Sequence, residues 1–311
     1  MRLWRSLQPC AGKDVASAGH VATVGGFDGV HLGHRVLMER TRELARLRGS
    51  DTMVVSFEPL PKEFLSPGEP VARLTSFRER WRILEADGPD VFCVLPFNAR
   101  LRSMRATEFA LLLARAGIRQ LVIGHDFRAA YRGEADADWF RRHASALGLD
   151  VEIVAPVCNQ GERVSSGLIR QALQAGELDR AARLLGRPYS MRGRVVRGEQ
   201  LGRKLGFPTA NLRLSRRRAP MDGIFAVRVR GLDGEGARQG VASLGTRPTV
   251  GGVTPLLEAH VFDFSGDLYG REIEVEFVAR LREERRFDQI EAMVEQMHLD
   301  ASAARAVLGV R

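Results

Sequence analysis

The segment VATVGGFDGVHLGH, residues 21–34, decides the fold of the first half of the chain. It opens with a short apolar run typical of a buried strand and passes through a glycine-rich turn. It then enters a stretch in which Leu37, Leu44 and Leu47 recur at helical spacing. A buried strand that leads into an amphipathic helix predicts a sheet of parallel strands covered on both faces. Ligands of such sheets bind beyond the carboxyl ends of the strands, so the turn itself is a candidate binding site.

The same alternation of strands and helices continues to about residue 185. Apolar runs typical of buried strands occupy residues 53–57, 91–97, 120–124 and 151–157. Amphipathic stretches typical of helices lie at 77–86, 108–116, 138–147, 166–175 and 178–185. We therefore predict an α/β domain built on a parallel sheet.

The sequence pattern changes after GRPYS, residues 186–190, from strand–helix alternation to β-rich runs. The runs RGRVVRG, GIFAVRVRG, GVASLG, LLEAHVFDF and REIEVEFVARL are β-rich and are joined by Gly, Asp and Pro. This pattern favours antiparallel strands in a sandwich or barrel, and an amphipathic helix over 288–308 closes the chain. We predict two domains, 1–186 and 187–311.

Composition agrees with two ordinary globular domains. The chain has 311 residues, and 44% of them are apolar, which excludes a disordered chain. Its apolar runs fall well short of the roughly 18 residues that a membrane span needs, and no apolar leader is visible at the N-terminus. The three cysteines, Cys10, Cys93 and Cys158, are odd in number and far apart, so we expect reduced thiols and a cytoplasmic protein.

The net charge of +9 comes almost entirely from arginine. A positive surface attracts anions such as nucleotides, flavin phosphates or nucleic acid, but it can equally be a solvated basic surface. A nucleic-acid-binding protein is the remote alternative. It predicts aromatic and arginine residues gathered on one face, whereas the aromatics here are scattered and only SRRRA, residues 215–219, is densely basic.

Two histidines in the first turn are candidate phosphate-binding residues. His31 and His34 are three residues apart, so at the start of a helix they share a face. The neighbouring glycines let the backbone approach a phosphate, and a helix N-terminus offers unpaired N–H groups. The pattern is neither G-x-x-x-x-G-K-[ST] nor G-x-G-x-x-G. The alternative is a tight turn with incidental histidines.

H-x-G-H in this position resembles the adenylyl/cytidylyltransferase superfamily, and further segments narrow the resemblance. Read in order, the whole chain is similar to the prokaryotic bifunctional riboflavin kinase/FAD synthetase family. The segments that carry this are FEPLPKEFL (57–65), RLTSFRER (73–80), GHDFR (124–128), RVSSGLIR (163–170), LLGRPYS (184–190), GRVVRGEQLGRKLGFPTANL (193–212), GIFAVRV (223–229), LGTRPTV (244–250), LEAHVFDFSGDLYG (257–270) and LREERRFD (281–288).

For the first domain the resemblance implies a Rossmann-like nucleotidyltransferase that transfers AMP from ATP to FMN, giving FAD and pyrophosphate. It implies that His31 and His34 are catalytic. The residues implied to bind ATP and its phosphates are Gly26, Phe27, Asp28, His31, Gly33, His34, Ser165, Ser166 and Arg170. Asp126 and Arg163 are implied to bind the flavin. From the residues alone, Ser165 and Ser166 could be a helix N-cap and Arg170 a solvated side chain.

For the second domain the resemblance implies an antiparallel β-barrel that phosphorylates riboflavin to FMN with ATP and Mg²⁺. Gly198 and Gly202 belong to the glycine-rich loop implied to wrap the ATP phosphates. Thr209 and Asn211, two residues apart on an extended segment, would point the same way and are implied to bind Mg²⁺. Glu258 matches the general base, although the pattern by itself also fits an exposed strand carboxylate.

The first domain departs from the usual family pattern at Gly26, Leu60, Ala129, Ala130 and Gly167. The usual residues at the first two of these positions are Asn and His. A riboflavin kinase with a weak or inactive adenylyltransferase domain is therefore the nearest alternative. The expected partners are small molecules (riboflavin, FMN and ATP), and we expect neither nucleic acid nor a membrane.

Overall fold

The computed structural model describes residues 1–7, 19–66, 68–198, 202, 205–232, 236–249 and 252–310. Cys10 and parts of the segments 193–212 and 244–250 lie outside these ranges. The chain forms two compact units, the first comprising residues 1–70 and 80–164 and the second residues 71–79 and 165–311. In the described part of the chain, no helix is both long enough and apolar enough to span a lipid bilayer.

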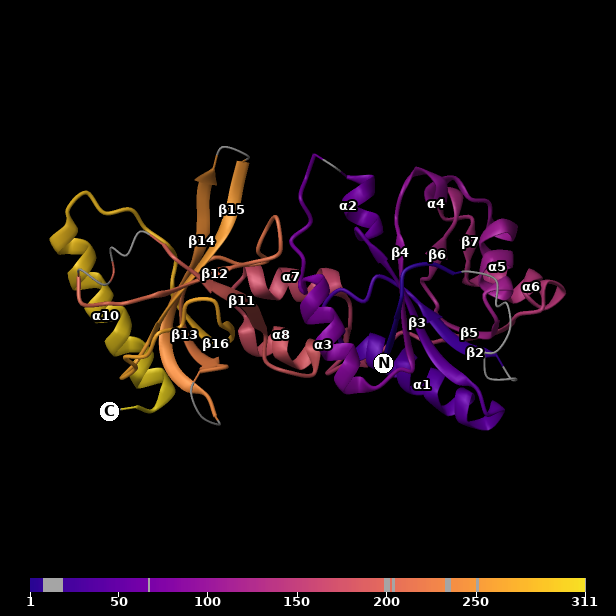
Figure 1. Cartoon of the computed structure of the whole chain (residues 1–311), viewed down its shortest axis with the longest axis horizontal. Helices are drawn as coiled ribbons and strands as arrows, with labels where there is room; N and C mark the ends of the chain where they lie inside the picture. Colours follow the sequence, from indigo (N-terminus) through magenta and orange to yellow (C-terminus); the bar gives the residue numbers. More distant parts are fainter. Residues whose placement is uncertain are drawn as a thin grey trace. The chain divides into compact units, whose positions relative to one another are not determined.

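The first unit is built on a parallel sheet of six strands (Figure 1). Their order across the sheet is β1-β4-β3-β2-β5-β8, and every neighbouring pair is parallel. The strands are β1 (Arg2–Trp4), β2 (His20–Val24), β3 (Asp51–Glu58), β4 (Val91–Pro96), β5 (Ile118–Gly124) and β8 (Asp150–Val154). The helices are α1 (Leu32–Arg48), α2 (Pro61–Leu65), α3 (Phe77–Asp87), α4 (Ala99–Ser103), α5 (Ala106–Arg115) and α6 (Ala137–His143).

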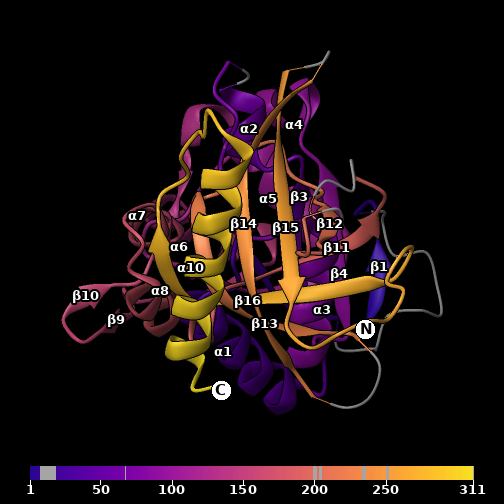
Figure 2. The ribbon, with the colours of Figure 1, turned by 90° about the vertical axis from the view of Figure 1, so that its left-hand side faces the viewer.

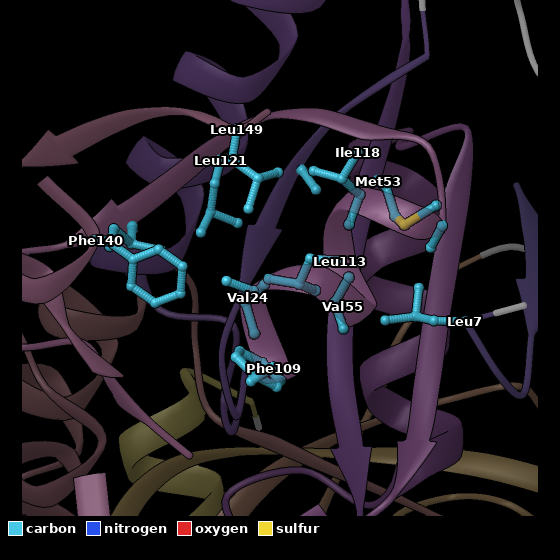
Figure 3. Packing of buried hydrophobic residues seen from close by; sticks show 14 of the residues in the cluster. Leu7, Val24, Met53, Val55, Phe109, Leu113, Ile118, Leu121, Phe140 and Leu149 are labelled. Atoms are coloured by element: carbon cyan, nitrogen blue, oxygen red, sulfur yellow. The ribbon is translucent and has the colours of Figure 1, made fainter. Parts of the chain in front are cut away.

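Helices cover both faces of this sheet, as the continuous apolar strands predict. On one face, Val21 and Val122 pack against Leu44 and Ala45 of α1. On the other face, a larger cluster combines alternate strand residues with α5 and α6. Figure 3 shows part of it, with Val24, Val55, Phe109, Leu113 and Phe140. Leu47 belongs to the helical pattern of α1 but is 81% exposed, because it lies in the last turn before the C-cap Gly49.

The second unit contains a closed barrel. Its strand order is β11-β12-β15-β14-β13-β16, and β16 pairs with β11 to close it; all pairs are antiparallel. The strands are β11 (Ser190–Val196), β12 (Ala210–Arg213), β13 (Gly223–Arg230), β14 (Arg238–Thr249), β15 (Gly252–Val261) and β16 (Glu272–Arg282). Helices α7 (Ser166–Gln174) and α8 (Leu178–Leu185) precede it, and α10 (Ile290–Leu308) ends the chain.

Helix α10 lies along the outside of the barrel (Figure 2). Its Ala301, Ala304 and Leu308 pack with Ala226 of β13 and Phe262, which follows β15. The barrel interior is filled separately, by alternate strand residues that include Leu212, Phe225, Leu244 and Leu257. The neighbours of these residues along each strand therefore face outward, where α10 covers some of them.

Residues 71–79 belong to the second unit although they are far from it in sequence. Their last residue, Glu79, forms an ion pair with Arg216, and both side chains are buried. Arg216 also donates to the carbonyls of Arg73 and Leu74 and to the Tyr189 hydroxyl. The basic run 215–219 is thus not a uniformly solvated loop: Arg217 and Arg218 are exposed, and Arg216 is a buried anchor.

The fold class predicted from the sequence is confirmed: a parallel α/β sheet, then an antiparallel barrel, then a terminal helix. The short elements were not predicted. They are β1, α2, α4, the two-residue pairs β6 (Arg128–Ala129) with β7 (Ala135–Asp136) and β9 (Cys158–Asn159) with β10 (Glu162–Arg163), and the 3₁₀ turns Tyr131–Gly133 and Ser145–Leu147. Segments this short carry too few residues for a periodic pattern. The domain division at 186/187 remains a prediction.

Candidate active sites

The H-x-G-H turn lies at the point where the first sheet changes its winding direction. From β2 the chain adds β3 and β4 on one side, and then β5 and β8 on the other. The turn after β2 and the loop after β5 therefore leave the carboxyl ends of two adjacent parallel strands. This is where open α/β sheets bind their ligands. The turn at 25–31 and Asp126 share this edge.

His31 and His34 cap the start of α1 reciprocally. The N–H of His31 donates to Nδ1 of His34 (3.3 Å), and the N–H of His34 donates to Nδ1 of His31 (3.4 Å). The two rings stack with their centroids 3.7 Å apart. Because each Nδ1 accepts a hydrogen bond, the neutral rings carry their hydrogen on Nε2. Each imidazole can therefore donate from its Nε2 to an anion.

The backbone of the turn is compact and strained. Phe27 (φ 50°) and Val30 (φ 42°) occupy the left-handed region, which costs a non-glycine residue on the order of 1–3 kcal/mol. Gly33 is favoured for a different reason, since a Cβ there would lie 3.2 Å from the His31 ring, a tight contact. The Phe27 ring packs on His34 with centroids 4.7 Å apart. Such local strain is typical of functional turns.

Asp126 and Arg163, the two residues predicted to bind flavin, are brought together. Their side chains form an ion pair, and both are largely exposed. Asp126 follows β5, and Arg163 ends the short strand β10. The pair leaves charged and hydrogen-bonding groups accessible at this sheet edge.

Ser165, Ser166 and Arg170 belong to the second unit. Ser165 is the N-cap of α7, and its Oγ accepts from the N–H of Leu168 (3.2 Å). The Nε of Arg170 donates to the carbonyl of Ala72 (2.8 Å), so this side chain is held rather than freely solvated. The carbonyl of Val164, the residue before Ser165, lies 3.9 Å from a Cβ built at Gly33.

Two of the departures from the family pattern are neighbours. A Cβ built on Gly26 would meet only Leu60, 3.8 Å from its Cδ2. Leu60 is buried and precedes α2. These two positions, which are polar in the usual family pattern, are therefore close together and carry no polar side chain here. Ala130 (φ 66°) adopts a left-handed conformation next to Ala129 of β6, and Gly167 lies in the first turn of α7.

The second unit contains a cavity of about 810 Å³ outside the barrel wall. Thr209, Asn211 and Glu258, all predicted from the sequence, line it together with Gly202. Asn211 pairs directly with Glu258 across β12 and β15, and Glu258 pairs directly with Ser243 across β15 and β14. The three side chains thus form one row across three strands on the outward face.

Gly198 and Gly202 lie directly beside this row. A Cβ built on Gly198 would come within 2.6 Å of the Asn211 Oδ1, and a Cβ on Gly202 would collide with the Phe207 carbonyl and lie 3.5 Å from the Thr209 Oγ1. The predicted loop glycines and the predicted oxygen donors are therefore adjacent. A side chain at either glycine would displace the neighbouring groups, which favours glycine at positions 198 and 202.

Sequence reasoning missed the far wall of the cavity. Ser243 Oγ donates to Glu284 (3.1 Å), and Arg282 pairs with Asp300 of α10. Loss of solvation raises the pKa of the Glu284 carboxyl, and the Ser243 hydrogen bond opposes this shift. The tail motif 281–288 was noted in the sequence, but no pattern shows that it faces Ser243. The remaining wall residues include Phe287, Met293 and Met297.

His260 lines the same cavity, where its ring is held by neighbouring groups. Its Nδ1 lies 2.9 Å from the Pro208 carbonyl, and its ring packs edge-on against Phe207 and Phe262. Among the residues that the structure describes, no three His, Cys, Asp or Glu side chains gather as a metal site. Thr209 and Asn211, the oxygen donors predicted to bind Mg²⁺, both line this cavity.

Two family models match the chain. The riboflavin kinase model (Flavokinase) matches residues 185–308, and the FAD synthetase model matches residues 13–168. Each match covers one of the two chemistries predicted from the sequence.

Curated relatives match nearly the whole chain. The bifunctional riboflavin kinase/FMN adenylyltransferase of Pseudomonas fluorescens is 44% identical over 292 residues, 93% of each chain. The protein of the same description from Escherichia coli K12 is 40% identical over 94% of each chain. A crystal structure described as a macrolide-efflux protein from Streptococcus pneumoniae has a TM-score of 0.79 at 30% identity and covers 98% of both chains.

Proposed function

Since the chain belongs to the bifunctional riboflavin kinase/FMN adenylyltransferase family, we propose which of its residues carry each reaction. The enzyme uses ATP to phosphorylate riboflavin to FMN and to convert FMN to FAD. We assign the first reaction to the cavity outside the barrel and the second to the turn after β2. We also propose that the protein works in the cytoplasm.

In the adenylyl transfer, a phosphate oxygen of FMN attacks the α-phosphorus of ATP. A new P–O bond forms, the bond from the α-phosphorus to the bridging oxygen breaks, and pyrophosphate leaves. No protein nucleophile is needed, so catalysis consists of positioning and charge stabilisation. The Nε2–H groups of His31 and His34 donate to the phosphate oxygens. The Phe27 carbonyl accepts a hydrogen bond from the Val30 N–H. Among the described residues the Phe27 N–H has no acceptor, so it is available as a third donor.

The remaining predicted residues bind the substrates of this step. Gly26, Asp28 and Gly33 shape the turn around the phosphates, and Gly33 leaves room for the His31 ring. Ser165, Ser166 and Arg170, in and before the first half of α7, stay proposed as ATP-binding residues. The Asp126–Arg163 pair contacts the flavin. What supports the role of the turn residues and of Asp126 is their position at the switch point of the sheet.

In the kinase reaction, the 5′-hydroxyl of riboflavin attacks the γ-phosphorus of ATP. The new P–O bond forms, the bond from the γ-phosphorus to the β–γ bridging oxygen breaks, and ADP leaves. The hydroxyl proton passes to the Glu258 carboxylate, which acts as general base. The observation that carries this assignment is the row of Asn211, Glu258 and Ser243 facing one cavity.

The residues at this cavity fit Mg²⁺. Neutral oxygen donors with few protein ligands suit a hard cation that also binds phosphate oxygens and water. Thr209 and Asn211 supply these oxygens, beside loop glycines whose missing side chains leave space for ATP. Bound Mg²⁺ would neutralise charge on the ATP phosphates, and Gly198 and Gly202 let the backbone approach them.

One chromatographic assay tests both assignments. The purified protein is supplied with ATP and Mg²⁺ and either riboflavin or FMN, and the flavin products are resolved. We expect Glu258→Ala to lose FMN formation and keep FAD formation from FMN, and His34→Ala to do the reverse. Loss of the same product in both variants contradicts the assignment. EDTA should abolish FMN formation.

A further inference from the structure

A buried arginine outside both predicted sites holds the backbone of the nucleotide turn. Arg80, on α3, is 1% exposed. Its Nη1 donates to the Gly26 carbonyl (2.7 Å), and its Nη2 donates to the Phe57 carbonyl (3.2 Å) and to the Glu58 carboxylate (3.0 Å). The fork of the guanidinium therefore connects the segment after β2 with the end of β3.

The Gly26 carbonyl has a second buried donor. Ser56 Oγ donates to it (3.1 Å), and Arg80 Nη1 also reaches Ser56 Oγ (3.3 Å). Both donors lie on one side of the Gly26–Phe27 peptide. In a trans peptide the carbonyl and the N–H point in opposite directions. The N–H of Phe27 is therefore directed away from Arg80, as an available donor.

This orientation is not the one that the backbone prefers by itself. Phe27 is held at φ 50°, and Gly26 before it has no Cβ to restrict rotation of their shared peptide. A flip of that peptide would return Phe27 to negative φ. The flip would also turn the Phe27 N–H toward the interior and the Gly26 carbonyl toward the ligand edge of the sheet. A carbonyl there repels phosphate, whereas an N–H attracts it.

We propose that Arg80 is a positioning residue for FAD formation: it fixes the Gly26–Phe27 peptide so that the Phe27 N–H points toward the ATP phosphates. Ser56 supports the same carbonyl. This inference rests on the proposed function of the turn and deepens it. The geometry that carries it lies wholly within the first unit, so the kinase activity of the same molecule serves as an internal control.

The test compares Arg80→Met, Arg80→Lys and Ser56→Ala in the full-length protein. FAD formation is measured from supplied FMN and ATP, and FMN formation from riboflavin and ATP. We expect Arg80→Met to lower kcat for FAD formation about 10²-fold, the scale of a misplaced or lost donor, with a much smaller change in the KM for FMN. Arg80→Lys, which keeps a buried cationic donor, should recover most of this loss. Ser56→Ala should cost a few-fold.

Arg48→Met is the matched control. Arg48 binds Gln120 and Asp150 at the opposite, amino-terminal edge of the same sheet, so this variant should keep both activities. Unchanged kcat for FAD formation in Arg80→Met overturns the proposal, and so does an equal loss in Arg80→Lys and Arg80→Met. If Arg80→Met does not fold, Ser56→Ala decides, and wild-type FAD formation by Ser56→Ala overturns the proposal. Failure of the wild type to make FAD would instead refute the proposed function.

Discussion

Asn211 and Glu258 are direct partners across β12 and β15, and both line the cavity outside the barrel. An amide that can bind a cation and a carboxylate that can accept a proton thus stand side by side on a rigid sheet. Neither residue depends on a mobile loop for its position. This rigidity is what phosphoryl transfer requires, because its catalysis is mainly the positioning of charges around the transferred group.

Glu258→Gln should lower FMN formation by about 10²–10⁴-fold, the usual cost of losing a general base. The amide keeps the size of the side chain but cannot accept the hydroxyl proton. The rate of FMN production from riboflavin measures this, and FAD formation from supplied FMN reports that the protein is folded. A variant that makes FMN at a near wild-type rate refutes the role of Glu258.

The two roles of His31 can be separated. His31→Asn keeps a side-chain acceptor suited to the N-cap of α1 but removes the imidazole Nε2–H. We expect it to lower FAD formation about 10²–10³-fold, as does the loss of one preorganised donor, while the thermal stability changes little. His31→Ala should lose both. If His31→Asn retains FAD formation, the histidine serves only as a helix cap.

Gly198→Ala should impair the kinase alone. The added Cβ would come within 2.6 Å of the Asn211 Oδ1, so either the loop or the donor must move. A shift of about 1 Å in a positioned group can cost on the order of 10² in rate. Gly68→Ala is the control, because a Cβ there meets nothing within 4 Å. Equal FMN formation by the two variants would contradict a close approach of Gly198 to Asn211 in the active enzyme.

His20 should make the first unit sensitive to mild acid. It is fully buried beside Trp4, its ring nitrogens lack hydrogen-bond partners in the described part of the chain, and burial lowers its pKa below 6.5. The folded state therefore favours neutral His20. Stability is fully present above about pH 6.5 and falls as the pH decreases below it.

Replacing His20 tests this. The difference in unfolding free energy between pH 7.5 and pH 5.2, from urea titrations, should shrink in His20→Leu. The exposed His143 gives a control in His143→Gln. The carboxyl of Asp90, whose pKa is lowered by hydrogen bonds from Thr52, titrates below this window. An unchanged pH dependence in His20→Leu would show that His20 is not the sensitive group.

Arg216 gives a prediction about the boundary of the kinase domain. In the full chain, Arg216→Met leaves the buried Glu79 carboxylate unpaired and should destabilise the second unit by about 3–5 kcal/mol. A fragment starting at residue 187 lacks Glu79 but contains every residue that lines the cavity. We expect the fragment to phosphorylate riboflavin, and Arg216→Met to have little effect in it.

The measurement is the urea midpoint for loss of FMN formation, in the full chain and in the fragment, each with and without the substitution. Glu79→Gln combined with Arg216→Met should recover much of the stability of the full chain. An insoluble or inactive fragment would mean that the kinase requires residues before 187. Equal destabilisation in both backgrounds would mean that Arg216 acts through contacts other than Glu79.

The parts of both sites that are local in sequence were predictable. His31 and His34 share one helical turn, and Thr209 and Asn211 share one side of an extended segment, so spacing alone places each pair. The pairing of Ser243 with Glu258 was not predictable, because it depends on the register of two strands. The ion pair of Glu79 and Arg216 joins residues 137 positions apart, and no periodicity in either segment indicates it.

Residues 71–79 have a consequence for how such enzymes can be recombined. The chain passes between the two units at 70/71, 79/80 and 164/165, so the kinase unit is discontinuous in sequence. A single genetic crossover near residue 186 would exchange the barrel without the segment that carries Glu79. The incoming barrel would then meet a foreign partner for its buried arginine. Chimeras of two such enzymes should therefore work best when residues 71–79 come from the same parent as the barrel.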